Sequence, residues 1–369
     1  MITAINNATI YTGEQVLQGQ SLLIRDERIL DIVSPDAVPA DATVTDASGH
    51  LLNAGFIDLQ IYGAGGYLFS NDPSPAALEA VTNAIVRSGV TTYMLTFATN
   101  EMAVYLKGFE TVQQHPHPAL AGIHLEGPYF NPVKRGAHIE QLIRKPTLQE
   151  VNVLLTAAKG TLRMMTLAPE VTGDEVLRLL KDHGVIISAG HSNASFAEAM
   201  HGFANGIHTV THLFNAMSPL HHRDTGLPGA AFLSDYAYAS IIPDGVHVDW
   251  EAFKIAKQMM GRRLFFITDA VQEVLQGPYM HVKKADRYTL PDGTLSGSCI
   301  TMPEGVRNAV RYGAVALDEA LRMASLYPAE VMQAADLGRI QKGAKANLVM
   351  LNDELELKQV WLEGRIQSW

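Results

Sequence analysis

Four ionisable residues end short apolar runs, each of the length of a β-strand: Glu126, His191, His212 and Asp269. Imidazole and carboxylate groups are normal ligands of zinc, and three protein ligands leave one position for water. Water on such a metal ionises at about pH 7, and a nearby carboxylate can accept its proton and return it to a leaving amine. These residue types therefore predict metal-dependent hydrolysis, with Asp269 as the group that handles the proton.

Each of these residues also has a plainer interpretation. Glu126 alone fits an exposed loop equally well, because acidic residues are usually exposed. The repetition of the pattern favours a shared site, since a buried carboxylate needs a cation, a hydrogen-bond network or a metal. We expect His208 to be a hydrogen-bonded core residue. The histidines in loops or helical patterns are predicted to be solvated or structural: His50, His115, His117, His183, His201 and His281.

Two further stretches suit parts of a substrate. His247 follows the seventh predicted strand and suits a donor to a developing oxyanion, with an exposed loop histidine as the alternative. Arg223 lies beside two histidines in the segment 219–223. A guanidinium fork there suits a phosphate, with a solvated turn as the alternative.

The elements that must position these residues alternate between strand and helix patterns, which predicts a parallel sheet or barrel. In a (β/α)8 barrel the carboxyl ends of all strands open onto one face, where catalytic groups from different strands meet. We therefore predict an α/β fold built on a TIM-like barrel. The eight strand-like runs are 51–59, 90–97, 120–126, 162–168, 185–190, 207–213, 237–242 and 264–269.

The sequence patterns at the two ends of the chain differ from the alternating strand and helix patterns of the middle. Short β-type runs separated by turn residues occupy the first fifty residues and recur near the C-terminus. We predict a small β-sandwich domain from residues 1–50 and 340–369, and a barrel domain from residues 51–339. Capping boxes that begin at Thr147, Thr172 and Ser195 predict three of the barrel helices.

Composition limits the partners and the compartment. The chain has 369 residues and a formal net charge of −10, without a cluster of Lys and Arg, which argues against nucleic acid or an anionic membrane surface. Cys299 is the only cysteine, so no intramolecular disulfide can form. Neither a signal peptide nor a run of about 18 apolar residues is present, so we expect a soluble, cytoplasmic protein with no membrane partner.

Taken together, seven short motifs resemble the N-acetylglucosamine-6-phosphate deacetylases of the amidohydrolase superfamily. They span nearly the whole chain in the order of that family, and the ordered set is far more specific than any one member. The motifs lie at Gly55–Asp58, His124–Pro128, Ala189–Ser192, Thr211–Met217, Asp244–His247, Thr268–Ala270 and Leu295–Ser298.

The resemblance implies a role for each matching residue. Glu126, His191 and His212 would bind the metal, Asp269 would act as general base and acid, and His247 would hold the substrate carbonyl. One divalent metal per subunit is implied, with zinc expected and iron, cobalt or manganese as alternatives. A homodimer is also implied, in which Arg223 serves the neighbouring subunit. The implied substrate-binding residues are Ala137, His138, Asn215, Ala216, Arg223, His247, Leu295, Ser296 and Gly297.

The chain departs from the superfamily pattern in two places. Gln60 and Tyr62 stand where the superfamily usually has two histidines that support a second metal, and an amide is a poor ligand for a transition metal. A second-metal position is therefore expected to be lost. The segment 271–279 after Asp269 is bulkier than the small-residue run of well-known bacterial members, which places substrate selectivity in question.

The resemblance implies hydrolysis of N-acetylglucosamine 6-phosphate to glucosamine 6-phosphate and acetate, in amino-sugar catabolism. One alternative is an amidohydrolase that acts on a related N-acetylated sugar phosphate or a cyclic amide. Another is a catalytically silent barrel kept as a scaffold. Intact Glu126, His191, His212 and Asp269 speak against the silent barrel.

Overall fold

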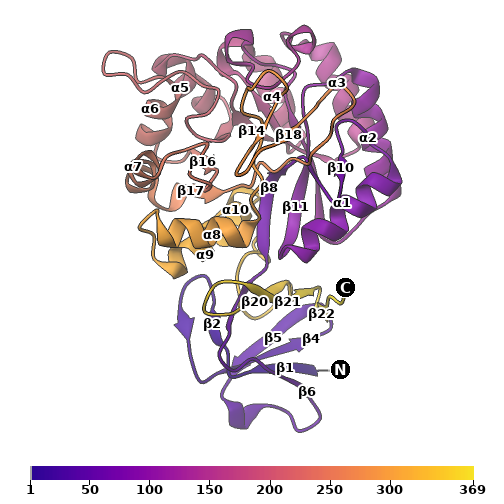
Figure 1. The fold of residues 1–369 in the computed structure, drawn as a ribbon, viewed down its shortest axis with the longest axis vertical. Helices are drawn as coiled ribbons and strands as arrows, with labels where there is room; N and C mark the ends of the chain where they lie inside the picture. Colours follow the sequence, from indigo (N-terminus) through magenta and orange to yellow (C-terminus); the bar gives the residue numbers. More distant parts are fainter. Residues whose placement is uncertain (1) are drawn as a thin grey trace. The chain divides into compact units, whose positions relative to one another are not determined.

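The computed structural model describes residues 2–369, which form two compact units. The first unit contains Met1–Asp58, Ala84–Thr92 and Thr301–Trp369, and the second contains Leu59–Asn83 and Tyr93–Ile300. Both chain ends belong to the first unit (Figure 1). The predicted boundaries at residues 50 and 340 lie inside this first unit, because it also includes a strand that follows residue 50 and three helices that precede residue 340.

The predicted barrel is confirmed. Eight parallel strands lie in one sheet in the order β17-β16-β15-β14-β13-β12-β11-β8. Beyond β17, Asp269 N–H donates to the Gln60 carbonyl and Tyr62 N–H to the Ala270 carbonyl, both at 2.9 Å, which brings the last strand beside the first. The strands are β8 (Phe56–Ile61), β11 (Val90–Phe97), β12 (Leu120–Glu126), β13 (Leu162–Leu167), β14 (Ile186–Ala189), β15 (Ile207–Val210), β16 (Tyr238–Ile241) and β17 (Leu264–Phe266).

The first predicted strand is wrong as a single element. The run 51–59 divides at Gly55 into β7 (Leu51–Ala54), which belongs to another sheet, and β8 of the barrel. Gly55 N–H donates to the Asn347 carbonyl at 2.7 Å, and a Cβ at Gly55 would lie 2.0 Å from the Thr91 hydroxyl. A glycine is therefore required at this division.

Helices alternate with the barrel strands along the chain, and three more follow the last strand (Figure 1). The predicted capping box of Ser195 with Glu198 is present, and the Thr147 hydroxyl accepts from Glu150 N–H. The box at Thr172 was wrong, because that hydroxyl donates to the Ala168 carbonyl and the helix begins later. The helices are α1 (Pro75–Arg87), α2 (Met102–Gln114), α3 (Leu148–Ala158), α4 (Asp174–Asp182), α5 (Phe196–Ala204), α6 (Gly226–Leu233), α7 (Trp250–Met260), α8 (Met302–Arg311), α9 (Leu317–Ala324) and α10 (Leu326–Val331).

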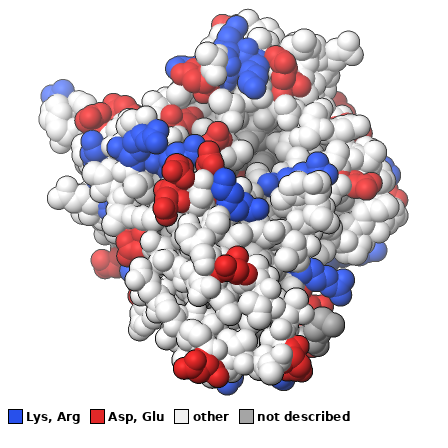
Figure 2. Space-filling model, turned by 60° about the horizontal axis from the view of Figure 1, so that its bottom comes forward, with Lys and Arg blue, Asp and Glu red and all other residues white. Residues whose placement is uncertain are grey.

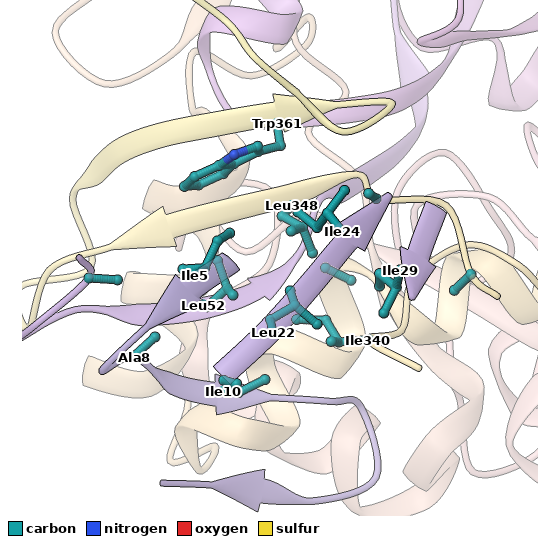
Figure 3. Close-up of a cluster of buried hydrophobic side chains, with 14 residues drawn as sticks. Ile5, Ala8, Ile10, Leu22, Ile24, Ile29, Leu52, Ile340, Leu348 and Trp361 are labelled. Carbon is teal, nitrogen blue, oxygen red and sulfur yellow. The ribbon is translucent and has the colours of Figure 1, made fainter. Parts of the chain in front are cut away.

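The predicted β-sandwich is formed by two sheets that share one apolar core. Strands from the two chain ends pair directly, since β20 is antiparallel to β7. The side chains of Ile5, Leu22, Leu52 and Leu348 gather between the sheets with Trp361 (Figure 3). One sheet contains β1 (Ile2–Asn6), β4 (Ser21–Arg25), β5 (Arg28–Val33) and β6 (Thr43–Asp46), and the other β2 (Thr9–Tyr11), β3 (Val16–Leu17), β7, β20 (Leu348–Leu351), β21 (Leu357–Leu362) and β22 (Arg365–Ile366).

Charged side chains of both signs are mixed on the face of the molecule in Figure 2, where Lys and Arg lie next to Asp and Glu. None of the helices in residues 2–369 is long and apolar enough to span a membrane.

Replacement of Leu52 by alanine tests the shared core of the two small sheets. Leu52 is fully buried there, so we expect Leu52→Ala to lower the free energy of unfolding by about 2–5 kcal/mol. Urea unfolding followed by tryptophan fluorescence measures this change. Val16→Ala, at a position 48% exposed, is the control and should change stability by about 0.5 kcal/mol or less. Equal losses in the two variants would contradict the assignment of this core.

Candidate active site

The four ionisable residues named first lie together at the carboxyl ends of the barrel strands. Glu126 is the last residue of β12, whereas His191, His212 and Asp269 follow the ends of β14, β15 and β17 by two or three residues. The predicted strands extended further, to residues 190, 213 and 269. They end earlier because His191, His212 and Asp269 have positive φ angles of 48°, 35° and 53°, which an extended strand cannot contain.

Positive φ is uncommon outside glycine, and such strain is concentrated at functional sites. Phe214 and Ala216, which follow His212, also have positive φ, at 77° and 48°. The strained backbone turns each strand end so that its ionisable side chain enters a common buried space.

Glu126, His191 and His212 form a cluster whose ligand atoms all lie within 4.8 Å of one another. Nε2 of His212 lies 3.0 Å from Glu126 Oε1 and 3.2 Å from Nε2 of His191. Nδ1 of His191 donates to the Lys134 carbonyl at 2.9 Å, so Nε2 of the neutral ring directs a lone pair into the cluster. Convergent imidazole lone pairs beside a carboxylate fit a divalent cation.

The charge states of Glu126 and His191 suit a metal. Burial alone would raise the pKa of Glu126, but His191, together with the contacts of His138 and His212, outweighs burial and lowers the pKa well below its usual range. Burial lowers the pKa of His191 to about 4, so its imidazole is neutral near pH 7. An ionised carboxylate and a neutral imidazole are the forms in which these groups bind metals.

Gln60 joins the ligand carboxylate to Asp269. Its side-chain amide Nε2 donates to Glu126 Oε1 at 2.9 Å and to Asp269 Oδ1 at 2.7 Å. The amide therefore presents hydrogen atoms, not a lone pair, to the side of the site where a second cation would lie. This contact supports the prediction of a single metal, and Tyr62 lies nearby on the cavity wall.

His138 contacts the same carboxylate from the other side. The backbone N–H of Thr99 donates to its Nδ1 at 3.1 Å, so Nε2 carries the proton and donates to Glu126 Oε2 at 3.0 Å. Both ring nitrogens thus have protein partners here. The predicted contact of His138 with sugar or phosphate stays a prediction.

Asp269 has an environment suited to proton transfer, and His247 has one suited to donating a hydrogen bond. Burial, followed by the charge of Glu126, raises the pKa of Asp269 to about 7. Nδ1 of His247 lies 2.6 Å from Asp244 Oδ2, and the other oxygen of Asp244 accepts from the His247 backbone N–H at 2.9 Å. Asp244 therefore orients the ring and leaves Nε2 to face the cavity.

A cavity of about 330 Å³ opens onto this cluster, which is within the usual size for a small-molecule site. Arg223 is exposed on its loop and does not line the cavity. Lys134 is the only Lys or Arg on the cavity wall in the described part of the chain. The predicted residues that line the wall are Ala137, His138, Asn215, Ala216, His247, Leu295, Ser296 and Gly297.

The segment after Asp269 packs firmly against the barrel end. Val271 and Tyr279 are buried with Tyr62 and Leu68 in an apolar cluster and also line the cavity. The Tyr279 hydroxyl donates to the Thr99 carbonyl, and the Asn71 amide donates to the Tyr279 carbonyl at 2.7 Å. The bulky residues of this segment therefore form part of the cavity wall.

Sequence reasoning missed several parts of this site. Lys134 and His281 line the cavity; His281, predicted to be solvated or structural, is buried there. The role of Thr99, which orients His138, was also missed. Thr99 follows the end of β11 by two residues but is not ionisable, and His281 lies beyond the last barrel strand. A search for ionisable residues at strand ends could therefore not indicate either residue.

Comparison with known proteins confirms the resemblance noted in the sequence. The model of the amidohydrolase family matches residues 51–366, and the model described as the NagA composite domain matches residues 3–52. The chain belongs to the amidohydrolase family.

Its relatives are similar along almost their full length. The N-acetylglucosamine-6-phosphate deacetylase of Haemophilus influenzae is 33% identical over 98% of each chain. The N-acetylgalactosamine-6-phosphate deacetylase of Escherichia coli O157:H7 is 30% identical over 93% of this chain and 94% of its own. The crystal structure of N-acetylglucosamine-6-phosphate deacetylase from Pasteurella multocida has a TM-score of 0.95 at 33% identity and covers 100% of both chains. These names agree on the deacetylation of a hexosamine phosphate and differ in the sugar.

The cluster at the strand ends leads to a prediction about metal content. We expect the protein to bind about one divalent metal per chain, because three residues supply ligands and Gln60 supplies none. His191→Ala and His212→Ala should each lose most of the metal, measured by elemental analysis after dialysis. The exposed His183→Ala is the control and should retain it. Two equivalents of tightly bound metal would contradict the interpretation of Gln60.

Proposed function

We propose that this chain hydrolyses N-acetylglucosamine 6-phosphate to glucosamine 6-phosphate and acetate. The observation that carries the proposal is the buried Glu126, His191 and His212 cluster beside Asp269, at the end of a cavity of small-molecule size. Relatives named as deacetylases of N-acetylated hexosamine phosphates match this chain over almost its whole length.

Glu126, His191 and His212 would hold one divalent metal, with zinc as the expected ion and iron, cobalt or manganese as alternatives. When bound there, such an ion supplies Lewis-acid chemistry and lowers the pKa of water. The ring of His191 is oriented by the Lys134 carbonyl, and the carboxylate of Glu126 by Gln60 and His138. This supporting layer keeps the ligand atoms convergent.

Asp269 moves the proton. Its Oδ1 accepts from Gln60 Nε2, which leaves Oδ2 to take a proton from the attacking water. The new bond joins the water oxygen to the acetyl carbon, and the bond between that carbon and the sugar nitrogen then breaks. Oδ2 returns the proton to the departing amine, so the carboxylate is ready for the next cycle.

His247 stabilises the oxyanion that develops on the acetyl oxygen. Asp244 orients the imidazole through Nδ1, so Nε2 is the ring atom that can donate to the substrate. A pre-oriented donor in a buried site contributes more than one exposed to water.

The phosphate needs a cation on the cavity wall. Lys134 supplies one from the same chain, while Arg223 is exposed on a loop outside its own cavity. We propose that the protein is a homodimer in which Arg223 reaches the phosphate site of the partner subunit.

Acetate release by the metal-loaded protein tests the proposed function directly. We expect kcat/KM for N-acetylglucosamine 6-phosphate to exceed that for unphosphorylated N-acetylglucosamine by about 100-fold or more, because the phosphate contributes transition-state binding. The absence of acetate release from either compound would overturn the proposal. Equal rates on the two would keep the amide chemistry and overturn the phosphate site.

Asp269 should control the acid side of the pH profile. Its carboxylate must be ionised to accept a proton, so kcat/KM should fall as the pH falls through its pKa. This pKa is raised to about 7 by burial, and a bound cation lowers it. The midpoint should therefore lie between about 4 and 7. Asp269→Asn should lose about 10²–10⁴-fold in kcat at unchanged metal content; near-normal turnover would exclude the role.

Arg223→Ala tests the contribution of the partner subunit. KM for the phosphorylated substrate should rise by about 10-fold or more, because a charge-assisted contact is lost, while kcat changes little. Arg262→Ala, on a segment that does not line the cavity, is the control. An unchanged KM would remove Arg223 from the phosphate site, and a monomeric protein with full activity would exclude a shared site.

A further inference from the structure

His281 lies on the cavity wall in the segment that follows Asp269. Its backbone pairs with Val274 through two hydrogen bonds of 2.9 and 3.2 Å, just before the short strand β18 (Val282–Lys283), which pairs with β19 (Tyr288–Thr289). The residue is only 4% exposed. It is therefore held by a structured segment and is not a mobile surface histidine.

One nitrogen of the His281 ring is anchored and the other is free. Nδ1 lies 2.8 Å from the Ser296 hydroxyl, and the Ser296 backbone N–H donates to the Tyr288 carbonyl at 3.1 Å. Nε2 has no hydrogen-bond partner among residues 2–369, and it is not one of the polar atoms sealed inside the protein. Since His281 lines the cavity, Nε2 faces the space where a substrate would lie.

The chemistry of this nitrogen suits a hydroxyl group. Burial lowers the pKa of His281 to about 4, so the ring is neutral near pH 7 and offers no charge to a phosphate. Each nitrogen of a neutral imidazole forms one hydrogen bond, as donor or as acceptor. A sugar hydroxyl can accept in the first case and donate in the second. The cavity wall nearby is apolar, with Val271 and Tyr279.

The same cavity also contains the metal cluster. Glu126, His191 and His212 line it together with His281 and Ser296. A single amino-sugar molecule with its acetamide group at the cluster can therefore contact His281 with its ring. Apart from the acetamide and phosphate positions, the ring of such a sugar carries hydroxyl groups.

We propose that Nε2 of His281 binds the C3 or C4 hydroxyl of the amino sugar and so makes His281 a specificity-determining residue. This inference rests on the proposed function. Relatives named for N-acetylglucosamine 6-phosphate and for N-acetylgalactosamine 6-phosphate match this chain at similar identity, and those two sugars differ only in the configuration of the C4 hydroxyl. A hydrogen bond to a ring hydroxyl is the kind of contact that can tell sugars of this class apart.

The experiment compares four substrates on the metal-loaded protein: N-acetylglucosamine 6-phosphate, its C4 epimer, and its 3-deoxy and 4-deoxy analogues. We expect wild-type kcat/KM to fall by about 10-fold or more for at least one of the three altered sugars. In His281→Phe, which keeps a planar ring without nitrogen, that preference should shrink to about 3-fold or less. His281→Gln, which can still form a hydrogen bond to the sugar, should retain a larger preference than His281→Phe.

Controls separate specificity from stability. His183→Phe, on the exposed end of α4, should keep the wild-type preferences. Metal content of both His281 variants should match the wild type, and thermal unfolding should show that both variants are folded at the assay temperature. If His281→Phe does not fold, His281→Leu, which also lacks a hydrogen-bonding side chain, takes its place, and a preference reduced to about 3-fold or less supports the proposal.

Several outcomes would overturn the proposal. Wild-type rates within about 3-fold for all four sugars would exclude a hydroxyl contact. A uniform loss on every sugar in His281→Phe, or in His281→Leu if the Phe variant does not fold, with preferences unchanged, would make the residue merely structural. Acetate release with unchanged preferences overturns this inference alone, whereas no acetate release from any of the four sugars overturns the proposed function with it.

Discussion

The site depends on one buried carboxylate. Glu126 lies at the end of a barrel strand where water cannot solvate it, and an uncompensated buried charge costs several kcal/mol. Gln60 and His138 direct hydrogen bonds to its two oxygens, and Nε2 of His212 lies 3.0 Å from Oε1. The position of each of these side chains is therefore linked to the others through one anion, which explains why residues far apart in sequence form a single constellation.

This arrangement also separates the two carboxylates by function. Glu126 accepts hydrogen bonds from Gln60 and His138 and stays ionised, whereas the Asp269 carboxylate has Gln60 as its one donor among residues 2–369 and its pKa is raised to about 7. The pKa values of these two carboxyl groups, which the Gln60 amide links, are therefore shifted in opposite directions. The first suits a permanent ligand and the second suits a group that gains and loses a proton in each cycle.

Segments that follow the strands form much of the cavity wall, whereas the proposed metal ligands and the proposed proton-transfer residue lie at strand ends. The segment after Asp269 packs through Tyr279 and Val271 against the barrel end, and His281 and Ser296 line the same cavity as the cluster. A barrel that holds its ligands on rigid strands can change its substrate by altering such a segment. Relatives that share the fold but are named for different sugars are consistent with this division.

The sequence by itself determined the barrel, the terminal sandwich and the identity of the clustered residues. Strand periodicity and the parallel topology place Glu126, His191, His212 and Asp269 on one face without any knowledge of side-chain contacts. The tertiary structure alone decided the division at Gly55, the contacts of Gln60 and His138, and the position of His281. These features depend on contacts between residues far apart in the sequence, such as Gln60 and Glu126, which are 66 positions apart. Local sequence patterns do not indicate which distant residues will be in contact.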